Sequence, residues 1–165
     1  MRYKIAAILV LLQLAFFAAW AGYEEMLLRT GDSILVKTVP VDPRDLLSGQ
    51  YLELRYAFSS VESLGIESPG WSLRGKTVWV VLGPQGEFHV LRYATMERPA
   101  HLAEGEVALK GVTHYWNQVT FGIERYFVPE GTETPQARSL TVRLRVGKGG
   151  NARIETVYVN GEPWP

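Results

Sequence analysis

A nearly unbroken apolar run close to the N-terminus limits what this chain can fold into. Residues Ile5–Gly22 read IAAILVLLQLAFFAAWAG, and Gln13 is their only strongly polar side chain. As an α-helix this run is roughly 27 Å long, which is enough to cross the hydrocarbon core of a bilayer. We therefore expect residues 1–30 to form a membrane anchor and residues 31–165 to form a separate domain.

The charges that flank the run predict its orientation. Arg2 and Lys4 precede it, whereas Glu24 and Glu25 follow it. Because basic residues are retained on the cytoplasmic side, the N-terminus is predicted to be cytoplasmic and the domain extracytoplasmic, either periplasmic or at the cell surface. The full chain has 17 basic and 17 acidic residues, so without the two basic residues of the first 22 the remainder has a net charge of −2. The sequence thus predicts a single-pass membrane protein.

A cleaved signal peptide is the alternative to a retained anchor. Ala19 and Ala21 place small residues at the two positions that a signal peptidase reads, so cleavage after Ala21 is possible. The segment Glu24–Leu28 favours retention, because it can continue the helix as far as a stop at Gly31.

Beyond residue 30 the sequence is typical of β-strands separated by turns. No stretch there sustains the 3.6-residue period of a long helix, and only 59–64 and 134–138 are candidates for short helical turns. The pattern favours an antiparallel β-sandwich or a small β-barrel. The predicted strands are 33–39, 50–58, 77–82, 87–95, 106–117, 118–127, 140–146 and 152–159.

Alternation and turn residues make some of these predictions more detailed. Strands 77–82 and 87–95 flank the turn 83–86, and strands 140–146 and 152–159 flank the glycine-rich turn 147–151, so each pair is predicted to be a hairpin. In two strands the alternation also predicts which side chains face the core. They are Leu52, Leu54, Tyr56 and Phe58 in one strand, and Leu140, Val142, Leu144 and Val146 in the other.

A charged cluster precedes the second predicted strand. Asp42 can cap a helical turn, with Pro43 at its first position, Asp45 at its third, and Gly49 ending it. Alternatively, Arg44 and the two aspartates present a charged corner to a partner. Two carboxylates three residues apart supply too few oxygens to hold calcium unaided, so no metal is predicted here.

The strand that follows carries a family motif. Residues 49–56 read GQYLELRY, which resembles the signature G-D-Y-x-x-L-x-Y of the bacterial GDYXXLXY proteins, with Gln50 in place of the acid. The lead-in 41–47 (VDPRDLL) and the later stretch 121–131 (FGIERYFVPEG) are also similar to that family. The family implies a membrane-anchored protein of undetermined activity that associates with a multi-pass membrane protein. The motif residues, which are also the candidate interaction residues, are Asp42, Pro43, Arg44, Asp45, Gly49, Tyr51, Leu54, Tyr56, Glu124, Tyr126, Pro129, Glu130 and Gly131.

Aromatic residues stand next to charged ones in the later stretch. Tyr126 and Phe127 directly follow Glu124 and Arg125. Since adjacent strand residues point to opposite faces, only about half of such aromatics can enter one core. The others either pack across strands or form an exposed aromatic and Arg patch for protein or glycan contacts.

The sequence offers little to most catalytic chemistries. There is no cysteine, and His89, His101 and His114 lack metal-ligand spacing, so they are expected to be surface or hydrogen-bonded residues. The zero net charge and the lack of a phosphate-binding loop argue against nucleic-acid and nucleotide binding. We expect no cofactor.

Three functions follow from these observations. The first is a non-catalytic, membrane-anchored domain that partners an integral membrane protein. The second is an envelope hydrolase, which needs Asp42, Asp45, Glu124 or Glu130 to converge in one cleft. Glu53, Glu124 and Glu130 are also candidates for an acid and base pair across a cleft, but no spacing supports it. The third is a soluble ligand- or glycan-binding module released by cleavage. The strand pattern is also faintly similar to type I signal peptidases, although the Ser/Lys dyad of those enzymes is missing.

Overall fold

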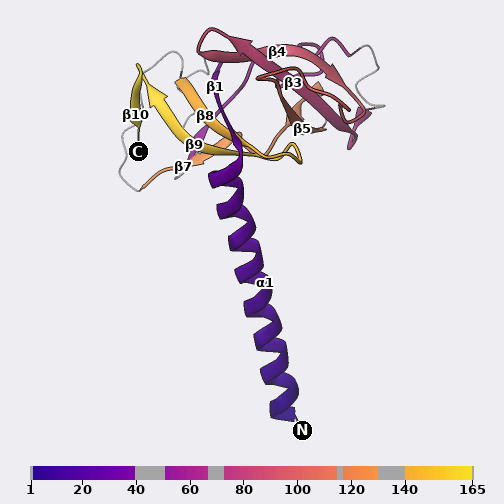
Figure 1. The fold of residues 1–165 in the computed structure, drawn as a ribbon, viewed down its shortest axis with the longest axis vertical. Helices are drawn as coiled ribbons and strands as arrows, with labels where there is room; N and C mark the ends of the chain where they lie inside the picture. The colour runs from indigo at the N-terminus through magenta and orange to yellow at the C-terminus, as the bar shows by residue number, and fades with distance from the viewer. Residues whose placement is uncertain (1, 40–50, 67–72, 115–116, 130–139, 165) are drawn as a thin grey trace.

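The chain folds into one long helix followed by a strand-rich domain (Figure 1). The structure is a computed structural model, and it describes residues 2–39, 51–66, 73–114, 117–129 and 140–164. All strand pairs within these residues are antiparallel, so the expected mainly β fold with an N-terminal apolar helix is confirmed.

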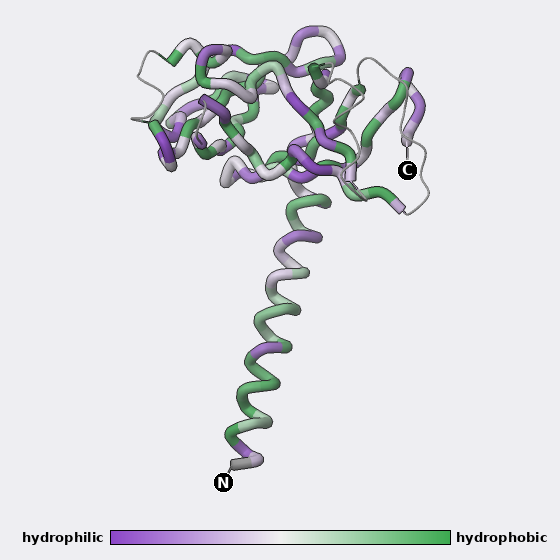
Figure 2. Tube along the Cα trace, turned by 180° about the vertical axis from the view of Figure 1, so that it is seen from behind, coloured by the Kyte–Doolittle hydropathy of each residue, from purple (hydrophilic) through white to green (hydrophobic). Residues whose placement is uncertain are grey.

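Helix α1 (Arg2–Thr30) projects from one side of the domain. Its segment Tyr3–Thr30 is long and apolar enough to cross a membrane, and its apolar window is fully exposed outside the domain (Figure 2). Anchors and signal sequences share these properties. The helix ends where the sequence predicts, because the amide of Gly31 donates to the carbonyl of Leu27 at 2.9 Å and the first strand then begins.

Two four-stranded sheets and one two-stranded ribbon make up the domain. The first sheet has the order β1-β8-β9-β10, with the bounds β1 Asp32–Lys37, β8 Leu140–Val146, β9 Ala152–Val159 and β10 Glu162–Trp164. The second has the order β4-β3-β5-β6, with the bounds β3 Thr77–Gln85, β4 Phe88–Thr95, β5 Val107–Thr113 and β6 Val119–Thr120. The ribbon pairs β2 (Tyr51–Glu53) with β7 (Arg125–Phe127).

One hydrophobic core joins the three sheets. Its largest fully buried side chains come from β3, β5 and β8 and from the loop segments next to β2 and β7. They are Leu54, Leu82, Leu109, Ile123 and Leu144. Each four-stranded sheet keeps two edge strands, so among the described residues the sheets do not close and the small-barrel alternative is wrong.

The predicted core faces are confirmed, although one strand is shorter than expected. All four inward residues of β8 are buried, and so are those predicted at 52, 54, 56 and 58. The chain leaves β2 after Glu53, however, and turns at 57–58 after a single bridge between Tyr56 and Thr38. Alternating burial therefore persists beyond the end of the strand.

Segment 59–64 forms successive turns instead of the expected helix. The amide of Leu64 donates to Val61 and that of Gly65 to Glu62, both at 3.1 Å. The hydroxyls of Ser60 and Ser63 bond to nearby backbone groups, which competes with helical hydrogen bonds. The predicted helical turns at 42–49 and 134–138 lie outside the described residues.

Strand boundaries in the middle of the chain differ from the prediction. Segment 106–127 splits into β5, β6 and β7, and β7 leaves the second sheet to pair with β2. The first hairpin is confirmed, but β3 runs on through Pro84 to a turn at 86–87. Beyond Leu82 β3 pairs only with β4, and proline is tolerated at such an edge. The second hairpin has the predicted bounds.

We expect Gly150→Ala to destabilise the domain by about 2–4 kcal/mol. Gly150 has a φ of +82°, and a Cβ there would lie 2.5 Å from the Trp79 ring. Gly149 in the same turn is the matched control, because a Cβ there would meet only Asn151, at 4.0 Å. Urea unfolding monitored by circular dichroism should place Gly149→Ala within about 0.5 kcal/mol of the parent. Equal effects of the two substitutions would contradict this packing.

Candidate functional site

The two motif stretches, far apart in sequence, pair with each other in the ribbon of β2 and β7. Tyr51 lies opposite Phe127, and Glu53 lies opposite Arg125. Successive residues of a strand point to opposite faces, so these four side chains share one face of the ribbon. On the other face, the Leu52 side chain is buried in the core.

Two signature residues hold the ribbon in place from the buried side. The amide of Leu54 donates to the carbonyl of Glu124 at 2.8 Å. The hydroxyl of Tyr56 donates to the carbonyl of Ile123 at 2.7 Å, and the Tyr56 ring stacks on Phe58. Burial raises the pKa of Tyr56 far above its usual value, and the nearby Glu124 charge adds to this. Leu54 and Tyr56 thus have structural roles.

The opposite face of the ribbon presents aromatic and cationic groups. The rings of Tyr51 and Phe127 meet edge to face, with centroids 6.0 Å apart. The guanidinium of Arg125 lies over the Tyr51 ring, 5.1 Å from its centroid. Phe127 is 73% exposed, although large apolar side chains usually gain from burial. Arg125 and Phe127 are exposed, as one of the two alternatives for this stretch predicts, and Tyr51 is half-buried. These three residues are named here the aromatic patch.

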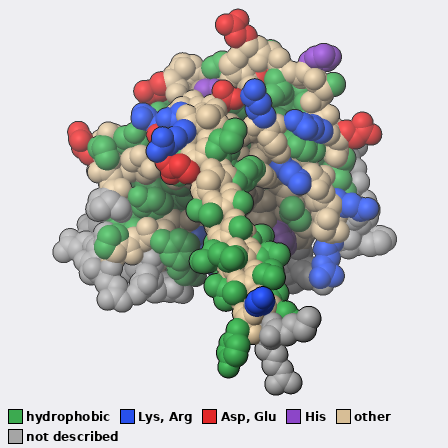
Figure 3. All heavy atoms as spheres, turned by 60° about the horizontal axis from the view of Figure 1, so that its bottom comes forward, with side chains coloured by type: hydrophobic (Ala, Val, Ile, Leu, Met, Phe, Trp, Pro, Cys, Tyr) green, Lys and Arg blue, Asp and Glu red, His purple; other side chains and the backbone are tan. Residues whose placement is uncertain are grey.

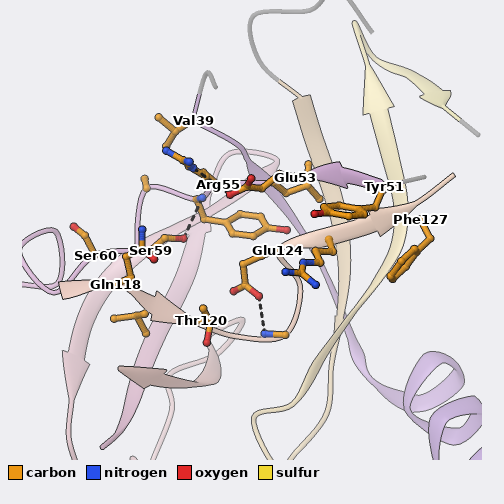
Figure 4. A pocket seen from close by; sticks show the side chains of 16 residues that line it. Val39, Tyr51, Glu53, Arg55, Ser59, Ser60, Gln118, Thr120, Glu124 and Phe127 are labelled. Atoms are coloured by element: carbon orange, nitrogen blue, oxygen red, sulfur yellow. Dashed lines mark hydrogen bonds and ion pairs between the residues drawn. The ribbon is translucent and has the colours of Figure 1, made fainter. Parts of the chain in front are cut away.

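A groove of about 900 Å³ lies beside the aromatic patch (Figure 4). The ribbon contributes one wall, which includes Glu53 and Arg125. Polar side chains from the turn after Tyr56 and from the segment around β6 line the rest. They are Ser59, Ser60, Gln118 and Thr120. The hydroxyl and amide groups of these side chains can hydrogen-bond to a peptide or another polar ligand.

Two carboxylates line this groove, and that of Glu124 is held by the backbone. Glu124 accepts hydrogen bonds from the amides of Phe121 and Gly122, at 2.5 and 3.0 Å, and so closes the turn that leads into β7. Glu53 lies 3.6 Å from Arg55 in an exposed ion pair, which contributes little to stability. Within the described residues, no three His, Cys, Asp or Glu side chains gather in a way that could hold a metal ion.

The remaining predicted residues are placed as follows. Tyr126 is half-buried and packs near Trp164, and Pro129 is exposed. His89 and His114 bond to Gly105 and Thr120, and His101 is exposed, as expected. The other motif residues lie outside the described residues. They are Asp42, Pro43, Arg44, Asp45, Gly49, Glu130 and Gly131.

Sequence reasoning missed the polar wall of the groove. Ser59, Ser60, Gln118 and Thr120 belong to no motif, and nothing in their spacing distinguishes them from ordinary turn and strand residues. They face the ribbon only because the bridge between Ser60 and Gln118 draws two distant segments together.

Fold and site together define a class of protein, a strand-rich domain carried on an N-terminal apolar helix, with a groove beside a paired motif ribbon. A family model described as GDYXXLXY protein matches residues 13–157, which is most of the chain, and the chain belongs to this family. Comparison with curated proteins and with solved structures gives no match.

We expect Tyr56→Phe to lower the free energy of unfolding by about 1–2 kcal/mol at neutral pH, because the Ile123 carbonyl loses its donor. Since folding raises the pKa of Tyr56, its stabilising effect is present below pH 10 and declines as the pH rises above the unfolded value of about 10. The difference between parent and variant should therefore narrow in alkali. Urea unfolding from pH 7 to pH 11 measures this, with Tyr93→Phe as the exposed control. A difference that widens with pH would contradict the assignment.

Proposed function

We propose that this protein is a non-catalytic, single-pass membrane protein whose extracytoplasmic domain binds an integral membrane protein through the aromatic patch and the groove. The observation that carries the proposal is the exposed Phe127 beside Tyr51 and Arg125, on a ribbon built from both family motifs.

The chemistry of the patch supports a protein partner. Aromatic residues and arginine are enriched at protein interfaces, and the aromatic side chains bury a large area with only two torsions to fix. The ribbon is firmly supported, because Leu54 and Tyr56 tie it to the segment that leads into β7. A preorganised surface of this kind loses little conformational entropy on binding.

The helix supports the membrane location. It is apolar throughout its central part, and the preceding Arg2 and Lys4 favour a cytoplasmic N-terminus. Anchor and partner would then lie in the same bilayer, which raises the effective concentration of one for the other. A weak contact at the patch would therefore be sufficient for association.

A photo-crosslinking amino acid at position 127, in the full-length protein in its native membrane, tests the proposal. We expect a covalent adduct with a protein that resists extraction by carbonate, because the patch contacts an integral membrane partner. The same amino acid at the exposed Tyr93, on β4 in the other sheet, is the matched control and should give no such adduct. Equal labelling from both positions would refute the assignment of the patch.

Substitution then tests how much each patch residue contributes to recovery of the partner. We expect Phe127→Ala and Arg125→Ala each to reduce recovery of that partner about tenfold or more, as interface anchor residues do. Tyr93→Ala should leave recovery unchanged. Both patch positions are exposed, so circular dichroism should show parent-like folding in every variant. Unchanged recovery in both patch variants would contradict the proposal.

Retention of the anchor has its own measurement. We expect the intact mass of the protein isolated from membranes to include residues 1–21, because the helix continues without a break to Thr30. A mature chain that begins at Gly22 would instead support the released binding module.

A further inference from the structure

The turn between β8 and β9 lies against the end of helix α1. A Cβ at Gly147 would lie 2.4 Å from Cδ1 of Leu27, so the leucine occupies the space that the glycine leaves free. The amide nitrogen of the Asn151 side chain donates to the hydroxyl of Tyr23 at 3.1 Å. Both ends of the turn therefore contact the helix just beyond the apolar run, which ends at Gly22.

These contacts place the turn at the height of the lipid headgroups. From Tyr23 to Leu27 the helix rises about 6 Å. The headgroup layer is about 5–7 Å thick on each side of a bilayer. If the apolar run fills the hydrocarbon core, the turn 147–151 lies within the headgroup layer of the leaflet from which the helix emerges.

Three cations gather at this turn. Lys148 is part of it, and Arg98 donates to the Lys148 carbonyl at 2.8 Å while its guanidinium lies over the Trp79 ring. The backbone amide of Lys110 donates to the carbonyl of Gly150 at 2.8 Å. Arg98, Lys110 and Lys148, named here the basic face, are all exposed.

The basic face keeps its positive charge. Within the described residues, no ion pair joins these three cations to a carboxylate. The two glutamates near the end of the helix are themselves paired, Glu24 with Arg153 and Glu25 with Arg29. Arg98 has one acidic neighbour in the sequence, Glu97. The three cations outnumber this single acid, so the face has a net positive charge. Seen from the side of the helix, Lys and Arg side chains spread over the domain surface beside it (Figure 3).

We propose that the basic face binds the headgroups of anionic phospholipids in that leaflet and so fixes the tilt of the domain on the membrane. The inference rests on the proposed membrane-spanning role of the helix. Each Lys or Arg close to an anionic membrane surface adds a favourable contribution that salt weakens. The contacts at Tyr23 and Leu27 hold the cations at the membrane surface. Lipid binding therefore does not have to offset the entropy cost of bringing a free domain from solution.

The chain has no cysteine, so a single introduced thiol can report on the basic face. Gly149→Cys places a fluorophore in the turn, and Glu87→Cys places one in the β3–β4 turn. The Lys37 ammonium lies over the Phe88 ring, so the β3–β4 turn lies near the end of β1 that is farther from the helix. The length of β1 puts this end about 17 Å from the helix. The full-length protein is placed in phosphatidylcholine nanodiscs that contain phosphatidylglycerol, with either lipid spin-labelled at the headgroup as a quencher.

We expect the label at 149 to be quenched more by spin-labelled phosphatidylglycerol than by the phosphatidylcholine analogue, and the label at 87 by neither. Lys110→Glu with Lys148→Glu should lower that preference about fivefold or more. Lys148→Arg keeps the positive charge and should therefore keep the preference for phosphatidylglycerol. Lys37→Glu reverses one charge on the far side of the domain, and this control should keep the preference too.

Equal quenching by the two lipids, or an equal loss of preference in Lys37→Glu, would overturn the inference and reassign the basic face to an acidic protein segment. If the helix failed to insert, so that carbonate released the protein from membranes, the proposed anchor itself would be refuted. Insertion without lipid preference refutes only the basic face.

Discussion

The contact between the end of α1 and the β8–β9 hairpin determines how the rest of the molecule is oriented. Leu27 fills the space above Gly147, and the Arg153 guanidinium binds the Glu24 carboxylate with two nitrogens, each at 2.5 Å. Since β8 pairs with both β1 and β9, a strand that contacts the helix is also central to the first sheet. The domain is therefore built outward from its attachment to the helix, and its surfaces have fixed directions relative to that helix.

The residues of the family motif lie on both faces of one ribbon and have different roles on each. Leu54 and Tyr56 are buried and bond to the segment before β7, so they maintain the pairing. Tyr51 lies on the opposite face with the exposed Phe127. The signature thus combines buried residues that hold the ribbon in place with a residue on its outer face. Under the proposed function, the same short motif both supports the ribbon and supplies part of the surface that binds the partner.

The proposed surfaces are compatible with each other. The aromatic patch belongs to the ribbon, whereas the basic face surrounds Trp79 of the second sheet at the helix attachment. A domain held on lipid headgroups by the basic face would present the patch to a neighbour in the same membrane at a constant height. The absence of cysteine means that this geometry depends on strand pairing and core packing alone.

Local patterns determined the helix, its stop at Gly31, the β8–β9 hairpin and the core face around Leu54, because hydrophobic period and turn residues act over a few positions. Tertiary structure alone decided that β7 leaves its neighbour β6 to pair with β2. It also decided which polar residues line the groove and that Arg98 joins Lys148 at the helix end. Those contacts join residues far apart in the chain. They form only when the shared core brings distant segments together, and no short stretch of sequence contains that information.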